Sequence, residues 1–252
     1  MIFQHLLFLL LGFLVGIIIN SLADTLPQRR GLKPPHCPHC DYRYPVAQRS
    51  VTLRLLLGVR QCPQCGQPVA LRGPLVEGST ALIFALLPAL FSNWPNLLIN
   101  ALYIAVLILI IVIDLEHRLI LDVVTLPMTG LALLFSLALT SDQNTIGLAV
   151  VGAVTGFVLF YFAYWIGQIM FGPGALGFGD VKLALLMGAM LGFHRIIFAL
   201  ILGILLGGLI SALLLASRRF SRNQFLPYGQ YLALAGIVMI LWGVQIVNWY
   251  IG

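Results

Sequence analysis

The chain has 252 residues, of which 60% are hydrophobic and 9% are charged, and its mean hydropathy is +1.02. This composition excludes an ordinary soluble globule and is typical of a polytopic helical membrane protein. Lys and Arg outnumber Asp and Glu by 14 to 8, but the basic residues lie in loops between apolar runs, where such residues set membrane topology. We therefore expect no nucleic-acid partner.

The first apolar run covers residues 6–22 and has no basic residue before it. Its first positive charges come only after it: Arg29, Arg30 and Lys33. A cleavable signal peptide has the reverse polarity, so we predict a first transmembrane helix, placed at 1–26, with its N-terminus outside the cytoplasm. Asn20 and Asp24 near its inner end are interpreted as an interfacial cap.

Residues 27–77 form the only substantial soluble segment, and this segment contains every cysteine of the chain. The cysteines form two C-x-x-C pairs, separated by 21 residues: Cys37 with Cys40, and Cys62 with Cys65. Two such hairpins present four thiolates tetrahedrally to a zinc ion, as in zinc ribbons. We therefore predict a structural zinc site formed by these cysteines, with a small strand-rich hairpin over 42–60.

Two alternatives to zinc stay open, namely two disulfides and inert thiols. Disulfides require that the loop face an oxidising compartment. His36 and His39 lie beside the first cysteine pair, but four thiolates already complete a tetrahedral site. An outer-shell role fits these histidines better than coordination.

Seven further apolar runs follow, so the chain is predicted to contain about eight transmembrane helices. Most runs are long enough for a hydrocarbon core of ~30 Å at about 1.5 Å rise per residue. The expected positions are 78–92, 96–113, 123–139, 146–171, 181–193, 196–216 and 226–250. The predicted fold is an all-α polytopic membrane protein with a small zinc-ribbon-like loop, in three parts: 1–26, 27–77 and a seven-helix domain at 78–252.

The loop charges predict the orientation of these helices. With the N-terminus outside, thirteen of the fourteen basic residues fall on the cytoplasmic side, and only Arg195 falls outside. Basic residues concentrate in cytoplasmic loops. The cysteine loop is therefore expected to be cytoplasmic and reduced, and Asp114 and Asp180 are expected at the same cytoplasmic membrane face. Arg195 is expected to reach the outer membrane surface from a helix end.

The stretch from Gly172 to Asp180 contains four glycines and one proline, which argue against regular helix there. Irregular backbone at membrane depth is tolerated only where it lines a cavity or is buried in protein. Asp180 follows this stretch directly, and Asp114 directly follows the apolar run at 96–113. The sequence therefore predicts a water-accessible pocket that contains both carboxylates.

Two carboxylates that face one water can share a proton, because like charges at close range do not both ionise cheaply. The ionised group takes a proton from the water, and the neutral group donates a hydrogen bond to the carbonyl under attack. Such a pair titrates as a unit. We therefore predict that Asp114 and Asp180 form the catalytic pair of a hydrolase.

Other polar residues nearby compete for this role. Asp122 is the nearest competitor of Asp114, whereas Glu116, His117 and Arg118 are interpreted as solvated charges or local pairs. Lys182 could orient the aspartates or contact a lipid phosphate. Pairs of small residues spaced four apart predict close helix packing: Gly12/Gly16, Gly152/Gly156, Gly188/Gly192 and Gly203/Gly207.

Several motifs together resemble the type IV prepilin peptidases, which are bacterial membrane aspartic proteases with a Gly-x-Gly-Asp signature. The motifs run in family order over most of the chain: Asn20 with Pro27, the paired C-x-x-C loop, Pro74–Glu77, Asp114–Asp122 with Thr125–Pro127, Gly177–Lys182, and Pro227–Gly236. Leu121 is a departure, because the family usually has proline before the following Asp.

The resemblance implies an enzyme that removes the leader of prepilins or type II secretion pseudopilins after a glycine at the cytoplasmic membrane face. It implies Asp114 and Asp180 as the catalytic pair, and a bacterial inner-membrane location. Members with the cysteine loop typically also methylate the new N-terminal amine with S-adenosylmethionine. The sequence identifies no residues that bind this cosubstrate, and Glu77 is only a weak candidate.

Two other function classes stay open. A proton-coupled transporter would use membrane carboxylates as a relay, but transporters of this kind commonly contain inverted repeats, and the sequence shows no convincing repeat. A scaffold for pilus or secretion assembly would use the zinc loop for docking and would need no carboxylates.

Overall fold

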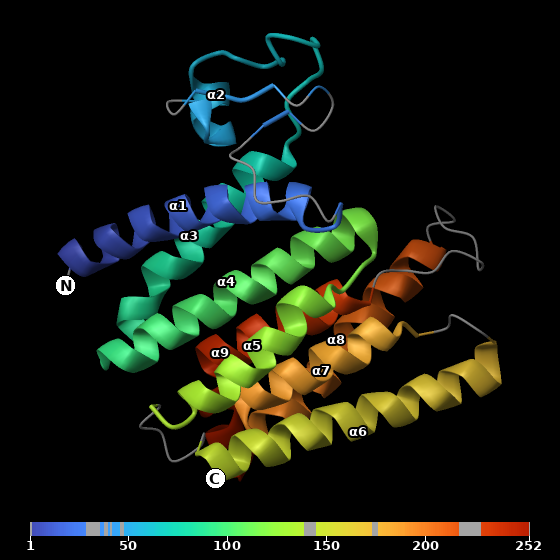
Figure 1. Ribbon diagram of the computed structural model, residues 1–252. Coiled ribbons are helices and arrows are strands. Elements are labelled where there is room, and N and C mark those ends of the chain that lie inside the picture. The colour runs from blue at the N-terminus through green and yellow to red at the C-terminus, as the bar shows by residue number, and fades with distance from the viewer. Residues whose placement is uncertain are drawn as a thin grey trace. The chain divides into compact units, whose positions relative to one another are not determined.

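The computed structural model describes residues 2–28, 36–37, 40, 42–45, 48–138, 145–172, 176–216 and 228–251. These residues form nine helices (Figure 1): α1 Ile2–Thr25, α2 Val51–Leu56, α3 Arg72–Leu90, α4 Trp94–His117, α5 Asp122–Phe135, α6 Ile146–Phe171, α7 Phe178–Leu191, α8 Phe193–Ala216 and α9 Gly229–Ile251. The chain divides into two compact units, Met1–Leu97 and Leu98–Gly252, and each is considered by itself. The predicted boundaries near 26 and 77 stay predictions.

Each of the eight predicted apolar runs contains a helix, and α2 is additional. Six of the described helices, α1, α3, α4, α6, α8 and α9, are long and apolar enough to cross a membrane. The remaining two, α5 and α7, have 14 residues each. The prediction of an all-α polytopic membrane protein is therefore confirmed, with eight as an approximate number of spans.

Two helices, α3 and α4, extend beyond their predicted apolar runs. α3 begins at Arg72 rather than 78, because Pro74 is tolerated in a first turn whose N–H groups need no helical partner. α4 continues to His117, so Asp114 lies inside the helix near its end. Arg118 then takes a positive φ of 54°, which ends the helix.

In the N-terminal unit, α1 and α3 run antiparallel and in close contact. A Cβ placed on Gly12 would lie 2.6 Å from Cβ of Phe84, and one placed on Gly16 would lie 2.7 Å from Cα of Glu77. Only glycine therefore permits the observed approach of the two backbones. The predicted packing role of this glycine pair is confirmed.

The prediction of a strand-rich hairpin over 42–60 is wrong for the described residues. This segment contains helix α2, which begins after the N-cap Ser50. Pairing of β type is limited to two isolated bridges, His36 with Arg43 and Gln61 with Pro68, one around each cysteine pair. The cysteine hairpins therefore form as expected, whereas the segment between them finds its backbone partners within α2 and in Glu77.

In the C-terminal unit, α6 and α7 pack antiparallel with their backbones in direct contact. A Cβ placed on Gly152 would lie 2.6 Å from the carbonyl oxygen of Gly188, and one on Gly156 would collide with the carbonyl oxygen of Ala184. α8 and α9 also run antiparallel, because Gly203 meets Leu232 while Gly207 meets Tyr228. The small residues of these helices thus act as predicted.

Helix α7 occupies the centre of the C-terminal unit. It contacts α5, α6, α8 and α9, and its residues from Leu186 to Leu191 are all buried. The last turn of α4 and the first turns of α7 and α9 share one end of this unit, as the contacts of Asp114 with Gln230 and of Gly229 with Asp180 require. Three helix termini therefore converge where the aspartates lie.

The orientation of the protein across the membrane stays a prediction. Several of the basic residues on which it rests, at 29–33 and 218–222, lie outside the described residues, as does His39. Arg195 is buried at the N-terminal end of α8 and its Nε donates to the Leu191 carbonyl at 2.8 Å. Arg195 therefore packs inside the unit and does not extend freely toward solvent as expected.

Candidate active site

Asp114 lies one turn before the end of α4 and is almost completely buried, with 4% of its surface exposed. Its Oδ2 accepts a hydrogen bond of 2.9 Å from the backbone N–H of Gln230, in the first turn of α9. The first N–H groups of a helix have no helical acceptor. The free N-terminus of α9 therefore holds the carboxylate of Asp114.

Asp180 is the third residue of α7 and is also buried, with 7% of its surface exposed. Its N–H donates to the Gly177 carbonyl at 3.1 Å, and its carboxylate hydrogen-bonds to the Gly177 backbone. The expectation of irregular backbone up to Asp180 is wrong for 178–180, which are helical. A carboxylate in the first turn stabilises a helix N-terminus, which offsets the helix-breaking glycines; residues 173–175 lie outside the described chain.

The structure brings the two predicted aspartates together at Gly229, the first residue of α9. A Cβ placed on Gly229 would lie 3.1 Å from Oδ2 of Asp114 and 3.2 Å from Oδ1 of Asp180. The two oxygens therefore cannot be further apart than the sum of these distances. That is close enough for both carboxylates to reach one water or one substrate atom.

Three glycines border this carboxylate pair, and their lack of side chains permits close contacts there. A Cβ on Gly229 would lie 2.8 Å from Cδ1 of Ile120, and a Cβ on Gly179 would lie 2.9 Å from Cβ of the same isoleucine. A Cβ on Gly177 would lie 3.3 Å from Oδ2 of Asp180. In the Gly-x-Gly-Asp signature, Gly179 therefore lets Ile120 approach α7, and Gly177 leaves space for the carboxylate of Asp180.

The competing polar residues lie elsewhere. Asp122 is exposed and forms an ion pair with Lys182, whose Nζ lies 2.6 Å and 2.7 Å from its two carboxylate oxygens. Lys182 therefore binds Asp122. The structure does not show Lys182 orienting Asp114 or Asp180. Glu116, His117 and Arg118 are exposed, which agrees with their interpretation as surface charges.

The sequence did not identify three parts of this arrangement: Ile120, Gly229 and the N–H of Gln230. The motif at Pro227–Gly236 was noticed only as part of the family pattern. Gly229 and Gln230 follow the residues at 217–227, which lie outside the described residues. No periodicity shows which backbone N–H meets a distant carboxylate. Proximity of a Tyr-Gly-Gln motif to an apolar run was the available signal.

The four cysteines form a second candidate site, in the N-terminal unit. Their sulfurs all lie within 4.8 Å of one another, and two pairs are at 3.7 Å (Cys37 and Cys65) and 3.6 Å (Cys40 and Cys62). A tetrahedron of sulfurs at about 2.3 Å from zinc has edges of about 3.8 Å. The cysteines are free thiols, so the geometry fits the predicted tetrahedral metal site, and the alternative of two disulfides does not hold.

The chemistry of the donors agrees with this fit. Burial alone raises the pKa of the Cys62 thiol, but backbone N–H groups of Cys65 and Gln64 stabilise the thiolate, and the pKa falls to about 6. Burial raises the pKa of Cys40 to about 12. A metal ion binds thiolates, so its binding would displace the protons of these thiols.

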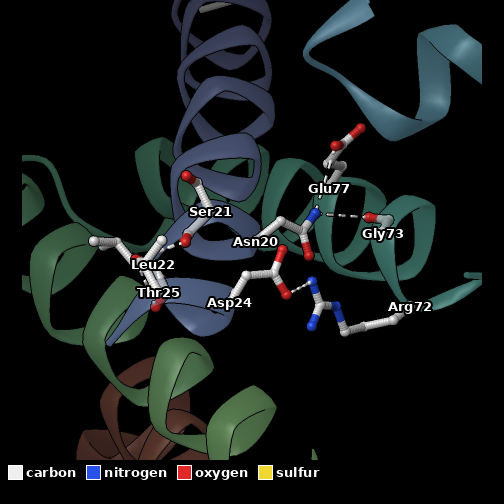
Figure 2. A network of polar contacts seen from close by, with 8 residues as sticks. All are labelled: Asn20, Ser21, Leu22, Asp24, Thr25, Arg72, Gly73 and Glu77. Carbon is white, nitrogen blue, oxygen red and sulfur yellow. Dashed lines mark hydrogen bonds and ion pairs between the residues drawn. The ribbon is translucent and has the colours of Figure 1, made fainter. Parts of the chain in front are cut away.

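A buried polar cluster lies where α1 meets α3. Figure 2 shows Asn20 of α1 facing Gly73 and Glu77 of α3, with Nδ2 donating to the Gly73 carbonyl at 3.1 Å and to Oε1 of Glu77 at 3.5 Å. Asp24 pairs with Arg72 at 2.8 Å. Asn20 therefore connects two helices, and the interfacial cap expected for it is wrong.

Glu77 is fully buried and binds the start of α2 as well as Asn20. Its carboxylate accepts hydrogen bonds from Ser50 Oγ at 2.6 Å, Val51 N at 2.9 Å and Thr52 N at 3.0 Å. These donors satisfy the carboxylate and the free N–H groups of the helix together. The observed role of Glu77 is to join the loop to α3.

Two family models match the chain: the bacterial peptidase A24 N-terminal domain at residues 10–91, and the type IV leader peptidase family at residues 101–212. The first range includes the cysteine loop, and the second includes Asp114 and Asp180. The two matched ranges follow one another along the chain in the same order as the motifs noted above. No solved structure matches the chain.

Similar curated proteins carry the name prepilin leader peptidase/N-methyltransferase. The protein of Aeromonas hydrophila is 31% identical, with 96% of this chain and 91% of the relative covered. That of Klebsiella pneumoniae is 32% identical over 73% of this chain and 82% of its own length. That of Pseudomonas aeruginosa is 29% identical, with 96% of this chain and 92% of the relative covered. Identity and coverage of this extent show that the chain belongs to the type IV leader peptidase family.

Proposed function

We propose that this protein is a membrane aspartic endopeptidase whose catalytic pair is Asp114 and Asp180. Its substrates are type IV prepilins or pseudopilins, from which it removes the leader peptide after a glycine. The observation that carries the assignment is the approach of both carboxylates to one point beside Gly229. The family and the names of the relatives support the substrate class.

The geometry suits general acid–base hydrolysis of a peptide. A water between the carboxylates loses a proton to the ionised group as it attacks the scissile carbonyl, while the neutral group donates a hydrogen bond to the carbonyl oxygen. The proton then passes to the leaving amine. The Gln230 N–H fixes Asp114, and the first turn of α7 fixes Asp180, so neither carboxylate needs to reorganise during the step.

The site lies at the ends of three helices, at the face that the loop charges predict to be cytoplasmic in the bacterial inner membrane. A prepilin helix would approach through the bilayer, with its leader on that face. Proteolysis requires an extended backbone at the scissile bond. Ile120 packs against Gly179 and Gly229 beside the carboxylates, so it would have to move aside to admit such a strand.

We also propose the second activity that the relatives' name states, methylation of the new N-terminal amine. S-adenosylmethionine would be the methyl donor, and no described residue is assigned to bind it. Zinc held by Cys37, Cys40, Cys62 and Cys65 would have a structural role, keeping the cytoplasmic loop at 27–77 folded between the helix at 1–26 and the peptidase domain at 78–252.

Substitution of single aspartates tests the catalytic pair. Asp114→Asn and Asp180→Asn are each expected to lower kcat/KM for a synthetic prepilin by at least about 100-fold, because one carboxylate cannot act as both acid and base. Asp122→Asn is the matched control, since this nearby acid is exposed and paired with Lys182. Product masses, measured with and without S-adenosylmethionine, report leader loss and the gain of one methyl group.

The outcomes separate the alternatives. Near-normal cleavage by Asp180→Asn would contradict the catalytic pair. A transporter would instead show proton flux in liposomes that Asp114→Asn abolishes. A scaffold would keep its function in the Asp114→Asn/Asp180→Asn double variant. No contact in the described residues favours either of these two classes over the peptidase.

A further inference from the structure

The metal loop buries an aromatic side chain against its cysteines. Tyr44 is 6% exposed, packs with Cys37 and Cys62, and donates a hydrogen bond from its hydroxyl to the Cys62 sulfur. Tyr42 meets its ring edge-on, with centroids 5.3 Å apart. The hydroxyl of Tyr44 is therefore held in place toward a predicted metal ligand.

A buried cation lies over the same ring. The guanidinium carbon of Arg54, on α2, is 3.8 Å from the centroid of Tyr44, and only 6% of this arginine is exposed. Its Nε has no hydrogen-bond partner among the described residues, and Asp41, the acid between the two cysteine pairs, lies outside them. Burial of a cation is costly unless negative charge lies nearby, so negative charge close to Arg54 would stabilise it.

The metal centre would supply that charge. Four thiolates around Zn²⁺ leave an excess of two negative charges, which a nearby cation and hydrogen-bond donors stabilise. We propose that Tyr44 and Arg54 form the outer shell of the metal centre: Tyr44 orients the Cys62 thiolate through its hydroxyl, and Arg54 balances the thiolate charge across the ring. The proposal rests on the proposed metal centre.

The outer shell also connects the metal centre to the membrane helices. Arg54 projects from α2, whose N-terminus is bound by the buried carboxylate of Glu77 on α3 through Val51 and Thr52. One short helix is thus held by Glu77 at its start and by Tyr44 through Arg54 near its end. Loss of the metal is therefore expected to loosen α2 and its bonds to Glu77.

The test measures zinc release from the purified full-length protein in detergent, after addition of excess colorimetric chelator. Tyr44→Phe keeps the ring and removes the hydroxyl, and Arg54→Gln removes the charge. Both are expected to release zinc about 10- to 100-fold faster than wild type, the usual effect of outer-shell changes on a metal site. Tyr42→Phe and Arg60→Gln are the matched controls, from the same loop, and should release zinc at the wild-type rate.

Further arms distinguish an outer shell from simple packing. Arg54→Lys keeps the positive charge and should therefore release zinc nearly as slowly as the wild type, unlike Arg54→Gln. The thiolate-to-metal absorption bands of the cobalt-substituted protein should shift in Tyr44→Phe. Cleavage of a synthetic prepilin by each variant shows that the peptidase unit is folded, because the carboxylate pair lies outside this loop.

Wild-type release rates in both Tyr44→Phe and Arg54→Gln would overturn the proposal. Release from Arg54→Lys as fast as from Arg54→Gln would overturn its charge argument. A wild-type protein that contains no zinc when purified would overturn the metal centre itself, while the peptidase assignment would stand on its own assay.

The connection through α2 has its own measurement. In the wild type, removal of zinc is expected to accelerate hydrogen exchange of the Val51 and Thr52 amides, which bind Glu77. Amides in α7 should exchange at an unchanged rate. Equal exchange of Val51 and Thr52 with and without zinc would overturn the connection.

Discussion

At the scale of single residues, the carboxylate pair depends on a position that has no side chain, Gly229. Asp114 and Asp180 both point at a position that a side chain of Gly229 would fill. Ile120 closes the same space from the segment after α4. The identity of Gly229 therefore matters to the site even though glycine carries no functional group.

Gly229→Ala is expected to lower prepilin cleavage by at least about 10-fold, because its methyl group would stand where a water must contact both carboxylates. Cδ1 of Ile120 can move aside, so folding should be retained. Gly130→Ala in α5 is the control, since no heavy atom of the described residues lies within 4 Å of its Cβ position. The measurement is kcat for prepilin cleavage by both variants, and thermal unfolding checks that both are folded. A normal kcat in Gly229→Ala would contradict the role of this space.

The sequence predicted the aspartates but not their surroundings. Two acids at the edges of apolar runs, on one predicted side of the membrane, are visible in composition and charge alone. The contact of Asp114 with the Gln230 N–H joins residues 116 positions apart, and only the packing of α4 against α9 produces it. Local patterns carry no information on such a pairing.

At the scale of elements, two kinds of helix contact hold the C-terminal unit together. α6 and α7 meet backbone to backbone through Gly152 and Gly188, whereas α9 meets α7 and α4 through ends of flexible side chains, since Gly236 lies against Met187 and Leu107. A backbone contact leaves no room for added atoms. The position of α7, and with it Asp180, is therefore fixed chiefly by α6.

Gly152→Ala is expected to lower the free energy of unfolding by roughly 1–3 kcal/mol, because the added methyl would press on the Gly188 carbonyl. Gly147→Ala, on the same helix, is the matched control, since its Cβ would meet no described heavy atom within 4 Å. Thermal unfolding in detergent compares the two. Equal Tm values for Gly152→Ala and Gly147→Ala would show that α6 and α7 are further apart than described.

Elements were predicted well where hydropathy decides and poorly where capping decides. The run at 146–171 coincides with α6, because a long apolar stretch has no competing structure in a membrane. The helix α2 was missed, since six residues are too few to show a period, and its stability comes from the distant Glu77. Tertiary partners of this kind are invisible to local sequence patterns.

At the scale of the whole molecule, the two compact units divide the proposed activities. The cysteines belong to Met1–Leu97, and the carboxylate pair belongs to Leu98–Gly252. The family models follow a similar division, at residues 10–91 and 101–212. The metal and the peptidase chemistry can therefore be perturbed separately.

Metal removal tests this division. Treatment with a zinc chelator is expected to make the loop at 27–77 susceptible to trypsin at its arginines, because a small loop of this kind gains its folding free energy from the metal. Lowering the pH should have the same effect, since protons compete for the thiolates. Mass spectrometry of the fragments should show new cuts in the loop and an unchanged pattern of cuts in the C-terminal part; resistance of the chelated loop would contradict a structural metal.

The seam between α6 and α7 also determines how a substrate can reach the aspartates. Helices locked by their main chains move as one body, whereas neighbours that touch through Met187 or Leu107 can slide apart by changes of rotamer. Admission of a pilin segment is thus expected to displace α9 while α7 stays in place. A cross-link between α6 and α7 should then leave turnover intact, and one between α7 and α9 should stop it.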